Sequence, residues 1–283
     1  MEHDDPVLLE VKGGVAVISL NIPDRHNVVG EAVDALFFRY LDLLRTDRDV
    51  RVVVWRGNGP SFSVGRDLGD IAGHDDGDGK TNGSGNGHLN GHGNGLHSTT
   101  SELELLERNH WATRLLYEFP VPIVCALKGW TLGTMFERAL LCDVRIAGEG
   151  AKLALPGVDH GVIPDSAGLA KLYEIGGTAL ALDLALTGRR IDAGEALRLG
   201  LVSEVVPDDE LDEVVLDRAR SIAERPPLVI RLIREHVQTL ASANVRTTLG
   251  REMVGQTIVL ASHDYREHRL ARAEDREARY ERR

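Results

Sequence analysis

The most constraining feature of this sequence is a short segment in which an apolar run, a glycine break and a helical pattern follow one another. Residues 122–127 are almost entirely apolar without alternation, which predicts a fully buried strand. Lys128 and Gly129 interrupt the run, and the apolar residues from 132 to 141 return at helical spacing. The segment therefore predicts a strand, a turn and the start of a helix.

The first turn of that helix has the properties of an anion-binding site. Its backbone N–H groups near Thr134 lack partners within the helix and lie at the positive end of the helix dipole. Such groups can hold an anion, or an oxygen atom that becomes negative during a reaction. Glu137 follows three residues later on the same helix face. This pairing suits proton transfer next to a thioester carbonyl, although a purely structural junction with a solvent-facing glutamate also fits the pattern.

Strands and helices alternate through the first two thirds of the chain. Two apolar runs flank Gly13 and Gly14 and predict a β-hairpin with a tight turn. Asp192 and Glu195 open a helix in capping-box style. Further helices are expected at 33–44, 102–117 and 167–173, and further strands at 50–55, 144–147, 151–155 and 201–206. Strands that alternate with helices pair in parallel, so the sequence predicts a layered α/β architecture.

Two loops between these elements carry candidate site residues. Residues 61–68 turn around Gly65, which lets the backbone approach a ligand closely, although this segment taken alone favours a simple turn at a strand end. Residues 156–168 form a long turn in which Asp165 or Ser166 stands where a helix N-cap would be, so capping and catalysis are both open for Asp165. His160, alone in the same loop, is expected to be structural.

Residues 73–100 form a low-complexity segment within one domain. Asparagine and glycine recur there at four-residue intervals and almost nothing apolar is present, so ordering the segment would cost conformational entropy without burial. We expect a flexible insertion. The segment also contains four histidines, but no cysteine or fixed ligand spacing accompanies them. The sequence therefore predicts no functional metal site.

The C-terminal third turns helical. Patterns at 208–223, 226–240, 245–261 and 264–279 predict four helices. We therefore divide the chain into an α/β core at 1–200 and a helical region at 201–283 that covers the site or makes subunit contacts.

Composition narrows the class of protein. The formal net charge is −11 and no long basic block occurs, which argues against a nucleic-acid partner. Cys125 and Cys142 both lie in apolar segments, which predicts buried free thiols and a reducing compartment. The first residues lack the basic and apolar regions of a signal peptide, and no apolar run is long enough for a membrane span. We therefore expect a soluble cytoplasmic protein without a membrane partner.

Taken together, these segments resemble the crotonase superfamily, the enoyl-CoA hydratase/isomerase group. Residues 14–27 resemble its N-terminal hairpin, and residues 49–57 with 61–68 resemble the strand and loop of its first oxyanion-hole group. Residues 128–143 are similar to its second oxyanion-hole helix, and residues 186–206 to the segment that follows. The resemblance spans the chain except for residues 73–100.

The resemblance implies a spiral core of repeated ββα units with a C-terminal helical region, assembled as trimers or hexamers. It implies an acyl-CoA thioester as substrate, with coenzyme A carried by the substrate and no separate cofactor. The thioester oxygen would accept hydrogen bonds from the backbone N–H groups of Arg66 and Thr134, which stabilise an enolate. By the same analogy, contacts to CoA and substrate come from the 23–26 turn, the 62–70 loop and the oxyanion-hole helix; the residues are Arg25, Val64, Gly65, Asp67, Leu68 and Gly133.

Departures from the family pattern bear on the reaction. Hydratases of the family use two glutamates; Glu137 matches the first, whereas the second position is Gly157, which has no acid–base group. The usual glycine is Thr134 here, and Arg66 replaces a small residue, with a side chain suited to CoA phosphates, a substrate carboxylate or solvent. Asp165 matches the position of a functional aspartate in dienoyl-CoA isomerases and aromatic dehalogenases. If Glu137 and Asp165 share one site, repulsion and burial would raise one pKa and leave an acid beside a base.

Three hypotheses follow. The first is enoyl-CoA isomerisation or single-carboxylate hydration, with Glu137 as the main acid–base group and Asp165 as its partner. The second makes Asp165 a nucleophile on a CoA thioester. The third is a CoA-binding oligomer subunit with little catalysis, in line with the missing carboxyl at Gly157 and the unusual Thr134.

Overall fold

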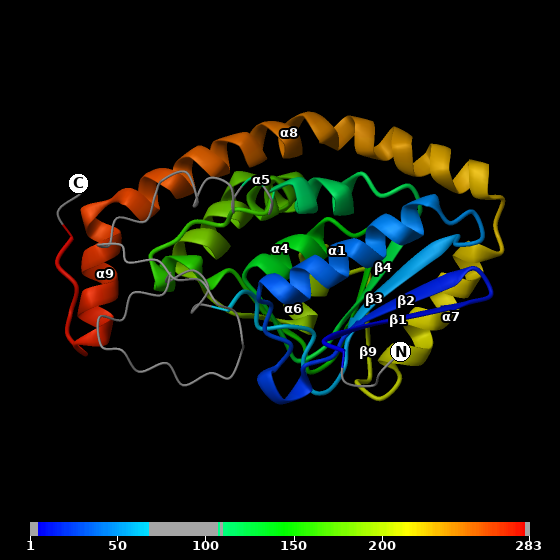
Figure 1. Ribbon diagram of the computed structural model, residues 1–283, viewed down its shortest axis with the longest axis horizontal. Helices are drawn as coiled ribbons and strands as arrows, with labels where there is room; N and C mark the ends of the chain where they lie inside the picture. Colours follow the sequence, from blue (N-terminus) through cyan, green and yellow to red (C-terminus); the bar gives the residue numbers. More distant parts are fainter. Residues whose placement is uncertain (1–4, 68–106, 108–109, 281–283) are drawn as a thin grey trace, which may run out of the picture.

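The computed structural model describes residues 5–67, 107 and 110–280 (Figure 1). The segment 73–100, its histidines and Leu68 lie outside the described residues. Within the described part of the chain, none of the helices is both long and apolar enough to span a membrane.

A six-stranded sheet forms the centre of the molecule. Its strands, in spatial order, are β1 (Val7–Lys12), β2 (Val15–Leu20), β3 (Val52–Gly57), β4 (Ile123–Leu127), β6 (Val144–Gly148) and β9 (Glu204–Val206). Only β1 and β2 pair antiparallel, as the hairpin at Gly13 and Gly14 predicts, and the other neighbours are parallel. A smaller sheet contains β5 (Trp130–Leu132), β7 (Lys152–Ala154) and β8 (Ile191–Asp192). The predicted α/β class with parallel pairing is confirmed.

Helices cover both faces of the central sheet. They are α1 (Glu31–Thr46), α4 (Thr134–Leu140), α5 (Gly168–Thr187), α6 (Ala193–Arg198), α7 (Leu211–Ala223), α8 (Pro227–Ala261) and α9 (His263–Ala273), with 3-10 turns η1 (Pro23–Arg25) and η2 (Pro156–His160). The larger core lies between the sheet and α1, α4 and α5, where Phe37 stacks on Trp55 at 4.5 Å between ring centroids. The smaller core lies on the opposite face, where Val54 packs with Val215 of α7. Alternate residues of β3 thus serve two cores.

Two expectations about helices prove wrong. The patterns at 226–240 and 245–261 predict two helices, but α8 is one continuous helix of 35 residues. Asp165 does not cap α5: the N-cap residue is Ala167, whose own side chain carries no acceptor. By contrast, the expected cap of α6 is present, because the Asp192 carboxylate accepts the Glu195 N–H at 2.7 Å.

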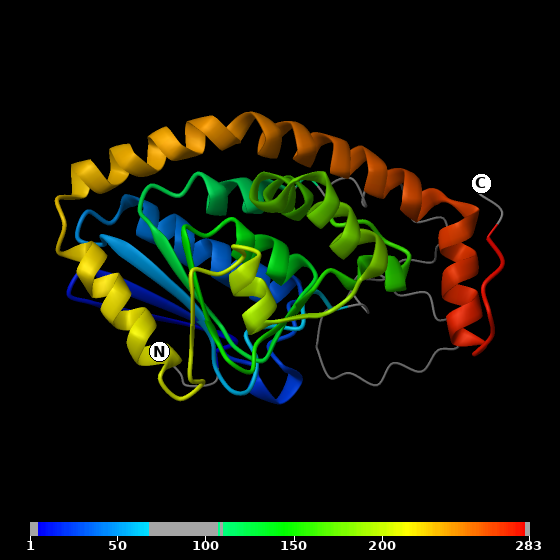
Figure 2. The same ribbon diagram turned by 180° about the vertical axis from the view of Figure 1, so that it is seen from behind.

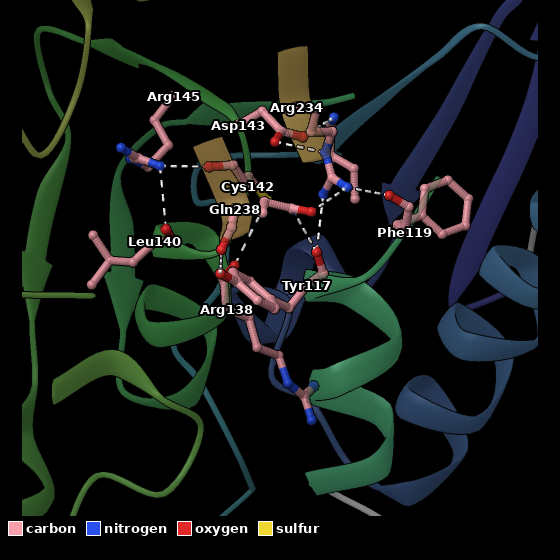
Figure 3. A network of polar contacts seen from close by, with 10 residues as sticks. Tyr117, Phe119, Arg138, Leu140, Cys142, Asp143, Arg145, Arg234 and Gln238 are labelled. Carbon is pink, nitrogen blue, oxygen red and sulfur yellow. Dashed lines mark hydrogen bonds and ion pairs between the residues drawn. The ribbon is translucent and has the colours of Figure 1, made fainter. Parts of the chain in front are cut away.

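Helix α8 arches along the molecule above α5, as both views show (Figures 1 and 2). Near its start, Arg234 is the main anchor. Its guanidinium pairs with the Asp143 carboxylate at 2.7 Å and donates to the carbonyl groups of Tyr117 and Phe119 (Figure 3). Gln238, one turn later, also donates to the Tyr117 carbonyl. These contacts tie α8 to Asp143 at the start of β6 and to the end of the helical segment 110–117.

Both cysteines are buried free thiols, as the sequence predicts. Cys125 lies in β4, and Cys142 follows α4, where its Sγ contacts the carbonyl of Arg138 at 3.7 Å. The Arg138 guanidinium itself is fully buried and forms a bidentate pair with Asp34 of α1. This pair fixes α4, and with it Glu137, against α1.

Candidate active site

Two loop segments run side by side at the start of α4. Ser63 forms a parallel bridge with Thr131: its N–H donates to the Trp130 carbonyl at 2.9 Å, and its carbonyl accepts the Leu132 N–H at 3.0 Å. Arg66 and Thr134 each lie three residues beyond this bridged pair. The register therefore brings the two predicted oxyanion-hole residues to the same end of the paired segments.

Glycines allow the close approach of these segments. Gly65 has φ +91°, and a Cβ there would lie 2.8 Å from the Leu132 carbonyl oxygen. Gly133 has φ +54° and directs the chain into α4. Val29 pairs with the residues on either side of Arg66, so the Arg66 N–H points away from it. Among the described residues, neither this N–H nor that of Thr134 has a hydrogen-bond partner, which leaves both for an outside acceptor.

Glu137 is buried one turn into α4, with 2% of the residue exposed. Its Oε2 accepts the N–H groups of Ser166 and Gly168 at 3.0 and 3.1 Å. Burial, and secondarily the charge of Asp165, raise the pKa of Glu137 to about 7. The predicted alternative of a solvent-facing glutamate is wrong, because this carboxyl is enclosed and held by the backbone.

Asp165 lies in the same buried cluster. It is 7% exposed, and its charge acts on both Glu137 and the His110 ring, which is hydrogen-bonded to the Asp165 backbone. Burial lowers the pKa of His110, and the positive charge of Arg66 lowers it further. The Arg66 side chain therefore lies near enough to act on His110, and its Nη2 is buried without a hydrogen-bond partner in the part of the chain that the structure describes.

Sequence reasoning missed two members of this cluster, Glu252 and His110. Glu252 belongs to α8 and is 4% exposed; its Oε2 accepts the Ala167 N–H at 2.9 Å. Burial, with the charges of Glu137 and Asp165, raises its pKa to about 9. No local signal marks Glu252, since it is one of several charged residues on a long helix. His110 lies in the predicted 102–117 helix, and its position in the helical pattern does not distinguish it from the neighbouring residues.

Other predicted contacts to CoA lie in the 23–26 turn and the loop that begins at residue 61. Arg25 pairs with Asp67 at 2.7 Å, and the Val64 N–H donates to the His26 carbonyl, so the 23–26 turn is joined to the 61–67 loop. Leu68 lies outside the described residues.

At Gly157, a Cβ would lie 2.8 Å from the Val162 carbonyl oxygen, so this turn has little room for a side chain. Among the described residues, no group of three or more His, Cys, Asp or Glu could hold a metal ion.

Comparison with known proteins identifies this arrangement. The family model for enoyl-CoA hydratase/isomerase matches residues 10–283. The chain belongs to the enoyl-CoA hydratase/isomerase family. The resemblance to the crotonase superfamily is thereby confirmed, and the family's substrates are acyl-CoA thioesters.

Relatives of this enoyl-CoA hydratase/isomerase family member cover most of its length. The chain is 30% identical to the 2,3-dehydroadipyl-CoA hydratase of Escherichia coli, over 89% of each chain. It is 28% identical to the 1,2-epoxyphenylacetyl-CoA isomerase of the same organism, over 92% of each. These relatives are named as a hydratase and an isomerase, and the protein is an enzyme of this type.

Solved structures of the family share its fold. An enoyl-CoA hydratase/isomerase from Pseudoalteromonas atlantica superimposes with a TM-score of 0.81 at 26% identity, covering 98% of this chain and all of the other. An enoyl-CoA hydratase from Bacillus anthracis gives 0.72 at 27% identity and covers 98% and 99%. The predicted crotonase-like α/β fold is confirmed.

Proposed function

We propose that the protein shifts the double bond of an enoyl-CoA thioester, with Glu137 as the acid–base group. The burial of Glu137 one helical turn after Thr134 carries this proposal. A carboxyl whose pKa is about 7 can accept a proton and return it at neutral pH. In a 3-enoyl-CoA, Glu137 would take a proton from C2, and the electron pair would move onto the thioester oxygen. Return of the proton to C4 would then give the 2-enoyl-CoA.

The N–H groups of Arg66 and Thr134 would stabilise the enolate. Their common place three residues beyond the Ser63–Thr131 bridge supports this role. Donors that are fixed before the reaction favour the charge that develops on the oxygen, and losing one such donor typically costs about 3 kcal/mol of barrier. CoA would then contact the segment around Arg25 and Val64, together with Gly65, Asp67, Leu68 and Gly133.

Asp165 would act as the partner of Glu137. Burial and the Asp165 charge together keep the Glu137 pKa in the working range, so that both protonation states are accessible near neutrality. The charge of Asp165 also acts on the His110 ring, which is hydrogen-bonded to the Asp165 backbone. The two carboxyl groups would thus work as an acid beside a base during the proton shift.

Hydration is the second candidate. The E. coli relative named 2,3-dehydroadipyl-CoA hydratase supports it. Water addition would also begin with charge on the thioester oxygen, but it requires a group that holds the water molecule. Gly157 has no side chain for that task, which is why we place isomerisation first.

The test is turnover of crotonyl-CoA and of a 3-enoyl-CoA, followed by the conjugated enoyl-thioester absorbance. Isomerisation of the 3-enoyl-CoA increases this absorbance, whereas hydration of crotonyl-CoA decreases it. Glu137→Gln should lower the rate of whichever of the two reactions the native enzyme catalyses at least about a hundredfold, as expected for loss of a general acid–base group. An unchanged rate in Glu137→Gln would exclude the proposed role.

Asp165→Asn separates the remaining alternatives. If Asp165 is the acid–base partner, the variant should be slower without forming an adduct. If it is a nucleophile, the native enzyme trapped with substrate should gain the mass of an acyl group, and the variant should not. Acyl-CoA binding without turnover of any tested enoyl-CoA would favour the CoA-binding subunit instead.

We also propose that copies of the chain associate through α8. The helix leaves several large apolar side chains exposed: Leu228, Val229, Leu232, Ile233, Val237, Leu240, Val254 and Ile258. A stripe of this kind along one helix is typical of an interface between subunits. We expect a trimer or a dimer of trimers by sedimentation, and a smaller species for Leu232→Glu. The same sedimentation behaviour in both proteins would contradict this interface.

A further inference from the structure

The turn that precedes α5 binds two glutamates from different helices. The N–H groups of Ser166 and Gly168 donate to Glu137 of α4, and the N–H of Ala167 between them donates to Glu252 of α8. Three successive N–H groups thus serve two carboxyl groups. A contact made by one carboxyl therefore influences the position of the other.

Ala167 makes this alternation possible at a conformational cost. Its φ is +64°, in the left-handed region that alanine rarely adopts. When a residue in the right-handed helical conformation adjoins one in the left-handed conformation, their successive N–H groups form a concave nest that binds anionic oxygens. The hydrogen bond from Ala167 to Glu252 satisfies the N–H of the strained residue itself. Glu252 is therefore well placed to hold the turn in this conformation.

Helix α8 holds the same loop at a second point. Gln256 follows Glu252 by four residues on one helix face, and its Oε1 accepts the Ile163 N–H at 3.1 Å. Between them, a Cβ at Gly255 would come within 2.9 Å of Ile163 Cδ1, so the helix and the loop are in close contact. Side chains of α8 thus bind both ends of the segment that carries Asp165.

The charges around Glu252 favour its protonated form. The charged groups that act on it are the carboxylates of Glu137 and Asp165, and burial opposes ionisation further. Burial and these charges raise its pKa to about 9, above that of Glu137 at about 7. At neutral pH, Glu252 therefore keeps its proton, whereas Glu137 is partly ionised. Its Oε1 has no partner among the described residues.

We propose that Glu252 of α8 is a positioning residue, whose carboxyl fixes the Ala167 turn and so holds the N–H groups of Ser166 and Gly168 on Glu137. The inference rests on the proposed role of Glu137 as the acid–base group. Glu252 itself is not assigned a contact with substrate. It acts by keeping the base in place and by adding no negative charge beside it.

The first test compares Glu252→Gln with Glu252→Ala at pH 7. Glutamine keeps an oxygen acceptor for the Ala167 N–H and resembles the protonated carboxyl, so kcat should stay within about twofold of the native value. Alanine removes the acceptor, and kcat should fall about tenfold or more while KM changes little. Arg251→Ala, an exposed change on the same helix, is the matched control and should leave both constants unchanged. Equal activity in the glutamine and alanine variants would overturn the proposal.

The pH profile supplies a readout that a merely structural contact would not move. In the native enzyme, kcat should fall above about pH 9, as Glu252 ionises beside Glu137 and Asp165. Glu252→Gln cannot ionise, so this alkaline decline should disappear. A decline of the same size in both proteins would contradict the protonated role.

Stability tests the same group without substrate, so that a failure of the proposed reaction does not obscure the result. Between the pKa of a carboxyl in the unfolded state and its raised pKa in the folded state, only the folded state holds the proton. In that range, each rise of one pH unit lowers the folding equilibrium constant about tenfold. Between pH 7 and 8.5 the native protein should lose stability at about this rate, and Glu252→Gln should lose clearly less. Parallel pH dependence in the two proteins would overturn the protonation of Glu252. Lack of turnover in the native enzyme would instead reject only the proposed function.

Discussion

Gly168 shows how a single missing side chain decides where Glu137 can lie. A Cβ at this position would come within 2.4 Å of Glu137 Cγ and 2.8 Å of its Oε2. The N–H of Gly168 meanwhile donates to that same oxygen. Glycine thus allows the backbone to approach the carboxyl closely enough to bind it.

Gly168→Ala should therefore displace Glu137 from its hydrogen bonds. We expect kcat to fall at least about tenfold and the free energy of unfolding to fall by about 1–3 kcal/mol, as overpacking of a buried site does. Denaturant unfolding and initial rates measure the two effects. The control is Gly250→Ala in α8, where no atom lies within 4 Å of the new methyl group. That variant should be unchanged or slightly more stable, and a similar loss in both variants would contradict the steric argument.

For single residues, the sequence predicts a functional role when the partner residue lies nearby in the chain. The spacing of Thr134 and Glu137 is visible because one helix turn joins them. The role of Asp165 as a cap fails because the N-cap position is taken by Ala167 in a left-handed conformation, and the N–H groups there donate to carboxyl groups from other helices. Glu252 could not be predicted, since its contact with Ala167 crosses 85 positions of sequence. Such a contact depends on how whole helices pack.

At the scale of the element, α8 unites the core and the site. Arg234 fastens one half of the helix to Asp143 and to two carbonyl groups, and Glu252 fastens the other half to the turn before α5. The helix continues through residues 241–244, where the apolar pattern pauses and two separate helices were expected. Residues 241–244 include two alanines and no proline or glycine, so a helix can continue through them. Tertiary packing of the helical turns before and after this stretch stabilises the continuous helix.

Removing the Arg234 anchor should destabilise the protein markedly. Arg234→Met would leave the Asp143 carboxylate and two carbonyl oxygens without their cationic partner, with an expected loss of about 3 kcal/mol. Arg246→Met removes a comparable but exposed pair with Glu118 on the same helix, and should cost about 0.5 kcal/mol. Chemical unfolding of both variants gives the comparison. Equal losses would contradict the anchoring role of Arg234.

At the scale of the molecule, the sequence predicts the layered architecture well. Apolar runs such as β4 are buried on both faces, and their alternation with helices leads directly to a parallel sheet. The short β5 was not predicted, because three residues carry too little pattern to distinguish a strand from a turn. Two elements of the predicted helical region at 201–283 belong with the sheet: β9 is its last strand, and α7 packs on one of its faces.

The buried carboxyls also affect the stability of the whole molecule. The pKa of Glu137 rises from an ordinary 4.5 to about 7 on folding, so the folded state binds a proton that the unfolded state has released. Between these values, stability should therefore fall as pH rises, by about 1.4 kcal/mol per pH unit for this group. Glu137→Gln should show a flatter dependence between pH 5 and 7 in denaturant unfolding. An unchanged slope would show that Glu137 does not hold the proton.

The most direct test of the central claim is proton exchange at the carbon next to the thioester carbonyl. A saturated acyl-CoA such as butyryl-CoA has no double bond to shift or hydrate, so exchange in D2O reports only on enolate formation. We predict that the native protein incorporates deuterium at C2, detectable by mass spectrometry, and that Glu137→Gln reduces the rate at least about a hundredfold. Exchange at the same rate in Glu137→Gln would contradict the assignment of Glu137 as the acid–base group.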